Sequence, residues 1–335
     1  MIIDEQRLLS VKNWLKTVCA MPDSELIALP SDASFRRYFR YPVDTRSYVV
    51  MVAPPNKEEL IAFISIAKNF SEHGIHVPEV LEHDINQGFI LLSDLGDALF
   101  LNILNDNCVD DLYTRALSVI PNIQVARPTL GSQQELGVFD EAFMRMEFNL
   151  FVHWFLSRHL SLNINSQRLS LLENIFQPIL TTLSEQTRVC VHRDYHSRNL
   201  LLLEEWDVGV LDFQDALYGP ITYDAVSLLR DAYIDWPAQQ VQRWVLNFRT
   251  MLPNQKVSEA QFLYWFDLTS VQRHLKILGI FARLCYRDNK PHYLANTQRI
   301  TGYLKQVCEK HAELSVLKQL LAAEIQPRLQ GLATE

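Results

Sequence analysis

The sequence predicts an α+β fold with two lobes, a small N-terminal lobe built on a β-sheet and a large, mostly helical C-terminal lobe. Short β-rich runs crowd the first 94 residues, and amphipathic helical patterns occupy nearly all of the rest. The length of 335 residues suffices for two full hydrophobic cores. We place the boundary at Asp94-Leu95-Gly96, which gives domains at 1–94 and 95–335.

The N-terminal lobe begins with a helical pattern and continues with four short strands. Apolar residues recur at helical spacing from Leu8 to Ala20, and a second helical stripe runs from Lys57 to Glu72. This second stripe falls between the second and third β-rich runs, which predicts a small sheet with a helix packed on it. The strands are expected at 35–41, 47–53, 80–83 and 89–92.

The C-terminal lobe shows long amphipathic stretches, and only the segment 188–212 interrupts them with short strands. Ser258-x-x-Gln261 fits a capping box at the start of one helix. That helix is expected to bury one stripe, made of Leu268, Val271, Leu275, Leu278 and Phe281. Helices are expected near 139–160, 166–184, 237–250, 258–286 and 312–326.

Composition and charge exclude several classes of protein. The net charge of −8 provides no positive field for a nucleic acid, and 48% apolar residues are typical of an ordinary folded protein. The N-terminus resembles no signal peptide and no run is long enough to span a membrane, so we expect a cytoplasmic protein without an obligate protein partner. The scattered cysteines are expected to be reduced: Cys19, Cys108, Cys190, Cys285 and Cys308.

The segment that interrupts the helices carries the most informative pattern, His192-Arg193-Asp194-x-x-x-x-Asn199. An apolar strand follows at 200–203, and a turn leads to a second strand at 208–211 that delivers Asp212. Two short strands joined by a tight turn would bring Asn199 and Asp212 side by side at the base of a cleft.

Phosphoryl transfer from ATP needs this set of groups. A carboxylate orients and deprotonates the attacking hydroxyl, and oxygen ligands hold Mg²⁺ against the phosphates. Asp194 fits the first role, and Asn199 and Asp212 fit the second. Two alternatives stay open: a chance surface tripeptide with Asp212 as a strand-end cap, and a transition-metal site of a hydrolase built from the alternating His192, Asp194 and His196.

Several features of protein kinases are missing. No glycine precedes Gly74, the strand SYVVMVAPP, where a protein kinase would carry its lysine, contains none, and Phe-Gln follows Asp212 in place of Phe-Gly. The next helix starts near Thr222, which leaves no room for an activation loop or a platform for a peptide. The acceptor is therefore expected to be a small molecule.

These residues resemble the aminoglycoside phosphotransferase and choline kinase superfamily, which has a protein-kinase-like fold. The stretches SDASFRRYFRY, HRDYHSRNLL, GVLDFQDALYGPITYDAVSLLRDAY and QRHLKILGIFARL resemble more closely the bacterial anomeric kinases of N-acetylmuramate and N-acetylglucosamine. The resemblance implies ATP and Mg²⁺ as cofactors and phosphorylation of the C1 hydroxyl of an amino sugar in peptidoglycan recycling. It also implies that Asp224 braces the catalytic loop. The alternative is a plain cap, because the helix dipole favours a carboxylate in the first turn of any helix. His192 and His196 are expected to brace the loop as well.

Nucleotide contacts are expected in the N-terminal lobe, at Ser34, Arg37, Arg40, Leu92 and Asp94. Small residues let the backbone approach phosphates, and guanidinium groups can replace the missing lysine. The alternative is that the arginines form the solvated face of a strand. Adenine is expected against backbone groups near Leu92, although the Asp94 side chain would also serve simply to start the next turn.

The acceptor pocket is expected to use polar side chains of two helical stretches, Glu147, Asn149, Arg230 and Asp231. Arg230 would supply a cation for an acidic acceptor. Such helical residues also fit a plain core, and aminoglycoside, choline or homoserine stay open as acceptors. A nucleotide-binding protein of this fold without catalytic activity is a further alternative.

Overall fold

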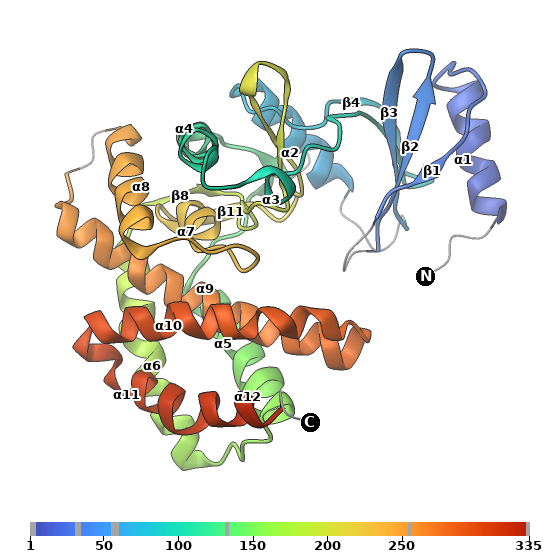
Figure 1. The fold of residues 1–335 in the computed structure, drawn as a ribbon. Helices are drawn as coiled ribbons and strands as arrows, with labels where there is room; N and C mark the ends of the chain where they lie inside the picture. Colours follow the sequence, from blue (N-terminus) through green and yellow to red (C-terminus); the bar gives the residue numbers. More distant parts are fainter. Residues whose placement is uncertain (1–4, 31–34, 55–59, 131–133, 254–255, 333–335) are drawn as a thin grey trace. The chain divides into compact units, whose positions relative to one another are not determined.

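The computed structural model describes residues 5–30, 35–54, 60–130, 134–253 and 256–332. The chain forms two compact units that interleave along the sequence (Figure 1). The first unit combines 1–100, 126–136 and 199–215, and the second combines 101–125, 137–198 and 216–335. None of the described helices combines the length and apolarity that a bilayer crossing requires.

The first unit is built on a five-stranded antiparallel sheet in the order β1-β2-β3-β5-β4. The strands expected from the sequence at four places are present as β2 to β5. The elements of this unit are α1 (Glu5–Thr17), β1 (Ile27–Ala28), β2 (Arg37–Val43), β3 (Arg46–Val52), α2 (Leu60–Glu72), β4 (Val80–Asp84), β5 (Phe89–Ser93), β6 (Thr129–Leu130), β7 (Gln134–Glu135), β9 (Leu200–Leu202), the 3₁₀ turn η2 (Glu204–Trp206) and β10 (Val208–Val210).

One face of this sheet forms a hydrophobic core with α1 (Figure 1). Alternate residues of a strand point to the same face, so each of β2, β3 and β5 contributes a pair of side chains. The buried cluster consists of Val11, Trp14 and Leu15 from α1 and Phe39, Tyr41, Val50, Val52, Phe89 and Leu91 from the sheet.

A separate antiparallel hairpin, β9–β10, belongs to the same unit although it lies more than 100 residues further along the chain. The chain after β5 pairs with it, because Leu202 N–H donates to the carbonyl of Ala98 at 2.8 Å. Phe213, just after β10, packs between Phe63 and Phe70 of α2, with ring centroids 4.8 and 6.0 Å away. The hairpin is thus part of the core of the first unit.

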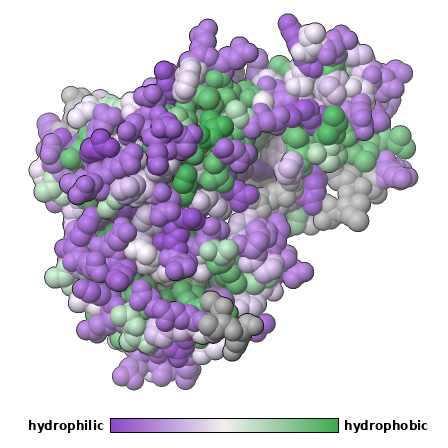
Figure 2. Space-filling model, in the orientation of Figure 1, coloured by the Kyte–Doolittle hydropathy of each residue, from purple (hydrophilic) through white to green (hydrophobic). Residues whose placement is uncertain are grey.

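The second unit is mostly helical and contains one two-stranded sheet, β8–β11. Hydrophilic side chains cover most of the visible surface over α10 to α12 (Figure 2). The elements are α3 (Phe100–Ile103, which begins at the last residue of the first unit), α4 (Val109–Val125), α5 (Glu141–Leu150), the π-helix η1 (Phe151–His159), α6 (Ser166–Glu185), β8 (Arg188–Val191), β11 (Leu217–Pro220), α7 (Tyr223–Leu229), α8 (Ala238–Met251), α9 (Glu259–Asp288), η3 (Pro291–Asn296), α10 (Thr297–Lys310), η4 (Ala312–Leu314), α11 (Ser315–Leu320), the π-helix η5 (Leu321–Ile325) and α12 (Gln326–Leu332).

The long helix α9 is the centre of the second unit. Its expected cap is present, since the Ser258 side chain accepts the Gln261 N–H at 3.2 Å, and its expected apolar stripe is buried. Gly279 lets α9 approach the junction of α5 and η1, because a Cβ on this residue would lie 2.3 Å from the carbonyl carbon of Leu150 and 2.4 Å from the nitrogen of Phe151. The two helices are therefore in backbone contact at this point.

Candidate active site

The two expected metal ligands lie at the same end of the β9–β10 hairpin, in the first unit. Asn199 directly precedes β9 and Asp212 follows β10 by two residues. The Leu211 N–H donates to the Asn199 carbonyl at 2.9 Å, next to the Leu200–Val210 pair of the ladder. An amide and a carboxylate therefore lie at the same end of two adjacent strands, and their binding of a metal ion stays a prediction.

Asp212 has an unusual backbone conformation, with φ of +63°. Left-handed backbone is uncommon outside glycine and is often found at functional sites. Phe213 anchors the position by its packing on α2, and the Gln214 amide donates to Asp212 Oδ1 at 2.8 Å. Carboxylate and amide oxygens are the ligands that Mg²⁺ takes from proteins, usually only one or two of them beside phosphates and water. The donor set of Asn199 and Asp212 fits this ion.

Asp194 belongs to the second unit, in a loop that follows β8. Asp224, at the start of α7 and fully buried, accepts the His192 N–H at 2.8 Å and the Arg193 N–H at 3.0 Å. This is the arrangement that a loop brace would have. Burial raises the pKa of Asp224 to about 7, although the two N–H groups act in the opposite direction.

The other two residues expected to brace the loop are also held within it. The His192 ring is buried, its Nδ1 accepts the Asp194 N–H at 3.3 Å, and it meets Tyr195 edge to face. The His196 N–H donates to the Asp194 carbonyl at 3.0 Å. The His196 ring lies edge-on to Tyr233, and burial lowers its pKa. Both histidines therefore pack within the loop that carries Asp194.

A buried group of charges surrounds Asp194. Burial alone would raise the pKa of this carboxyl, but the charges of Lys276, Arg273, His196 and Arg193 outweigh it and hold the pKa well below the usual range. The Asp194 side chain is 35% exposed. It is thus an ionised carboxylate that still reaches solvent, as a general base must.

Glu147 of α5, expected to contact the acceptor, is the hub of this network. Its carboxylate lies 3.0 Å from Arg193 Nη2 and 3.4 Å from Lys276 Nζ, and it accepts the Gln272 amide at 2.8 Å. Only 3% of Glu147 is exposed. A buried carboxylate with three partners is held as a structural element of the loop, and its contact with an acceptor stays a prediction.

The other expected acceptor residues lie in different surroundings. Asp231 is buried and accepts from the Ser197 N–H at 2.9 Å and from the Tyr233 N–H at 2.9 Å. Arg230 is buried in an ion pair with Asp267 at 2.5 Å, so a carboxylate already neutralises this cation. Asn149 lies on the exposed side of α5.

The expected nucleotide residues of the first unit are partly brought together. The Arg40 guanidinium forms ion pairs with two carboxylates: Nε lies 2.6 Å from Asp94 Oδ2, and Nη1 lies 2.7 Å from Asp97 Oδ2. Asp94 also accepts the Gly96 N–H at 2.9 Å, which is the turn-starting role. The remaining positions are Leu92, buried in β5; Arg37, partly buried at the start of β2; and Ser34, which lies outside the described residues.

Sequence reasoning missed the contribution of α9 to the loop. Gln272, Arg273 and Lys276 are all buried, and Arg273 Nη1 donates to the Arg193 carbonyl at 2.7 Å. The signal was present as several polar residues close together within an otherwise apolar stretch of a long helix. Buried charges without a partner are costly, so such residues indicate an internal ion network.

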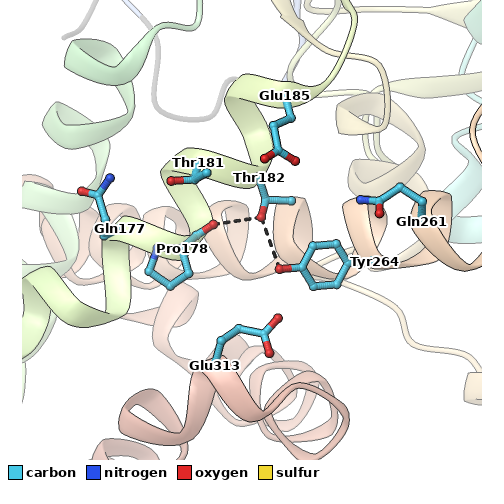
Figure 3. Close-up of a pocket in the computed structure, with 8 residues that line it drawn as sticks. All are labelled: Gln177, Pro178, Thr181, Thr182, Glu185, Gln261, Tyr264 and Glu313. Carbon is cyan, nitrogen blue, oxygen red and sulfur yellow. Dashed lines mark hydrogen bonds between the residues drawn. The ribbon is translucent and has the colours of Figure 1, made fainter.

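A surface groove of about 540 Å³ lies elsewhere in the second unit, between α6, α9 and η4 (Figure 3). The Thr182 hydroxyl at its centre donates to the Pro178 carbonyl at 2.9 Å and lies 3.4 Å from the Tyr264 hydroxyl. None of the residues that line it belongs to the Asp194 loop or to the expected site: Gln177, Pro178, Thr181, Thr182, Glu185, Gln261, Tyr264 and Glu313.

The comparison with protein families decides between the classes of function. A family model described as the phosphotransferase enzyme family matches residues 25–252, which is more than half of the chain. The chain belongs to the phosphotransferase enzyme family. The match includes Asp194, Asn199 and Asp212, and the hydrolase alternative for the His192 loop is therefore set aside.

Solved structures confirm the predicted fold class of this phosphotransferase. The choline kinase LicA of Streptococcus pneumoniae is similar with a TM-score of 0.63 and 11% identity, over 90% of this chain and 100% of that one. An ADP-bound aminoglycoside phosphotransferase is similar with a TM-score of 0.61 and 14% identity, over 89% and 97%. At such identities the likeness shows the kinase-like α+β fold alone.

Curated relatives are much more similar in sequence. An N-acetylmuramate/N-acetylglucosamine kinase of Pseudomonas aeruginosa is 42% identical over 308 residues, or 90% of this chain and 89% of that protein. A protein of the same name from Neisseria meningitidis is 39% identical over 325 residues, or 94% and 95%. The similarity spans both units of this phosphotransferase.

Proposed function

We propose that this phosphotransferase transfers the γ-phosphate of ATP to the C1 hydroxyl of N-acetylmuramate, N-acetylglucosamine or both. The observation that carries the proposal is 42% identity, along nine-tenths of both chains, to a kinase named for these two sugars. The product would be a sugar 1-phosphate, which supports a role in recycling the amino sugars of peptidoglycan.

In the proposed reaction Asp194 accepts the proton of the anomeric hydroxyl as that oxygen attacks the phosphorus. The ionised state of Asp194, held by Lys276 and Arg273, supports this role. An anomeric hydroxyl is more acidic than an ordinary alcohol, so a base of low pKa suffices. The structural brace of Asp224 on the loop backbone keeps the carboxylate oriented.

Asn199 and Asp212 would hold Mg²⁺, which neutralises charge on the ATP phosphates when it is bound. Their common position at one end of the hairpin and the oxygen donors that they offer support this role. The first unit would bind the nucleotide. Arg40 is a candidate there because its guanidinium is fixed in orientation between Asp94 and Asp97, and it would have to exchange one of these carboxylates for a phosphate.

The test is ADP release from Mg-ATP with a panel of acceptors, followed by phosphorus NMR of the product. The panel contains N-acetylmuramate, N-acetylglucosamine, glucose, choline, homoserine and an aminoglycoside. A sugar 1-phosphate from either N-acetylated sugar is the expected result. Turnover with choline, homoserine or the aminoglycoside alone would overturn the acceptor, and ATP binding without turnover on any acceptor would overturn the proposal of catalysis.

A further inference from the structure

Arg193, the residue before the catalytic carboxylate, has a left-handed backbone with φ of +75°. A bulky residue in this region costs of order 1–3 kcal/mol and persists only where its surroundings hold it. The direction in which the chain leaves Arg193 determines where Asp194 lies. Whatever holds the Arg193 peptide groups therefore also orients the base.

Both peptide groups of Arg193 are held by side chains of the second unit. Its N–H donates to Asp224 Oδ1 at 3.0 Å, and its carbonyl accepts from Arg273 Nη1 at 2.7 Å and from the Ser227 hydroxyl at 3.3 Å. The bond from Arg273 is the shorter of the two to the carbonyl, and charge-assisted bonds are the stronger kind.

Arg273 is itself held in place. It is 3% exposed, its guanidinium lies over the Tyr223 ring at 5.5 Å, and Nη1 lies 3.7 Å from Asp194 Oδ1. One nitrogen thus faces both the carbonyl of Arg193 and the carboxylate of Asp194. A planar guanidinium has several donors in fixed directions, which a lysine ammonium lacks.

We propose that Arg273 is a positioning residue for phosphoryl transfer: by binding the Arg193 carbonyl beside Asp194, it holds the loop in the left-handed conformation that orients the base. This inference rests on the proposed function, and it assigns to α9 a role in the reaction. Arg273 acts through the loop and need not touch either substrate.

The test compares Arg273→Met, which keeps the bulk of the side chain, with Arg273→Lys, which keeps the charge. For Arg273→Met, kcat should fall about 100-fold while KM for ATP and for the sugar changes little, because a 1 Å misplacement costs about this much. Arg273→Lys should recover part of kcat, and millimolar guanidinium should partly rescue Arg273→Met. Arg287→Met is the matched control, since Arg287 is on the same helix, is exposed, and pairs with the adjacent Asp288.

A readout independent of the acceptor is the crystal structure of Arg273→Met. It should show Arg193 outside the left-handed region and a displaced Asp194 side chain. Unchanged Arg193 geometry, or a kcat of Arg273→Met equal to that of Arg287→Met, would overturn the inference.

If the wild-type enzyme phosphorylates no acceptor, the proposed function fails, and the crystal structures of wild type and variant still decide whether Arg273 holds the loop. If Arg273→Met does not fold, the Lys variant decides: a kcat and an Arg193 conformation equal to wild type would contradict a role for guanidinium geometry.

Discussion

Gly279 of α9 lies against the backbone of Leu150 at the end of α5, so closely that no other side chain fits between them. The same two helices carry the Lys276–Glu147 ion pair, three residues earlier on each, with the two groups 3.4 Å apart. The helix crossing at Gly279 thus sets the distance between two buried charges beside the loop that carries Asp194.

Gly279→Ala should destabilise the protein and lower its turnover. The added methyl group would overlap the Leu150–Phe151 peptide, and overpacking typically costs about 1–3 kcal/mol. Urea unfolding and ADP release measure the two effects. Gly302→Ala on α10 is the matched control, because a Cβ there meets nothing within 4 Å and should raise stability by up to about 1 kcal/mol. Equal stability of Gly279→Ala and wild type would contradict the close contact.

Asp194→Asn should lower kcat by about 100- to 10,000-fold, the range for loss of a general base. The amide is of similar size but accepts no proton, so KM for ATP should change little. Steady-state kinetics with the best acceptor measures both values. Asp235→Asn serves as control, since Asp235 is exposed and pairs with Arg299. Near-full activity of Asp194→Asn would assign the base to another residue.

Asp212→Ala should abolish metal-dependent use of ATP. The carboxylate is the only charged group of the expected Mg²⁺ ligand pair, and without it the ion loses most of its attraction to the protein. A titration of turnover against Mg²⁺ at fixed ATP tests this. Asp207→Asn, at the opposite end of the same hairpin and paired with His76, should keep the normal Mg²⁺ dependence. A normal titration for Asp212→Ala would remove Asp212 from the metal site.

His274→Gln should change how stability depends on pH. His274 is fully buried, and burial lowers its pKa from 6.5 to about 3. The contribution of the neutral His274 ring to the free energy of unfolding is therefore complete above pH 6.5. It is lost as the pH falls toward 3, because the unfolded chain then takes up a proton that the folded chain does not. In His274→Gln the amide can still donate to the Arg230 carbonyl, as Nε2 does at 3.0 Å.

The stability difference between wild type and His274→Gln should therefore change in favour of the variant by up to about 1.4 kcal/mol per pH unit below 6.5. Urea unfolding of both proteins between pH 7 and pH 5 measures it. A constant difference over this range would show that the ring titrates normally in the folded protein.

The four strands β2 to β5, the β9–β10 hairpin and most long helices were predictable because their apolar residues repeat with periods of 2 and 3.6. Two of the longer helices were not anticipated, α4 (Val109–Val125) and α10 (Thr297–Lys310). The α4 helix contains Pro121, which normally indicates a helix boundary. Here tertiary packing outweighs the local preference, since both sides of Pro121 carry buried residues such as Leu117 and Ile123.

The site was predictable where spacing along the chain determines geometry and not where distant residues meet. Asn199 and Asp212 flank one hairpin, so their proximity follows from the sequence. Arg40 pairs with Asp94 and Asp97, which lie more than 50 residues further along the chain, and no local sequence pattern predicts this pairing. Arg230 illustrates the same limit, because only the fold shows that Asp267 already neutralises it.

The interleaving of the two units has a consequence for the order of folding during synthesis. The first unit needs residues 199–215 for its completion, since Phe213 packs against Phe63 and Phe70 of α2. A ribosome that has finished the sheet must therefore make well over 100 further residues before the aromatic side chains of α2 are covered. Contacts so distant along the chain form slowly and leave apolar surface exposed meanwhile. A fragment that ends at residue 94 would leave that surface exposed permanently. The sheet and the hairpin therefore have to be expressed and engineered together.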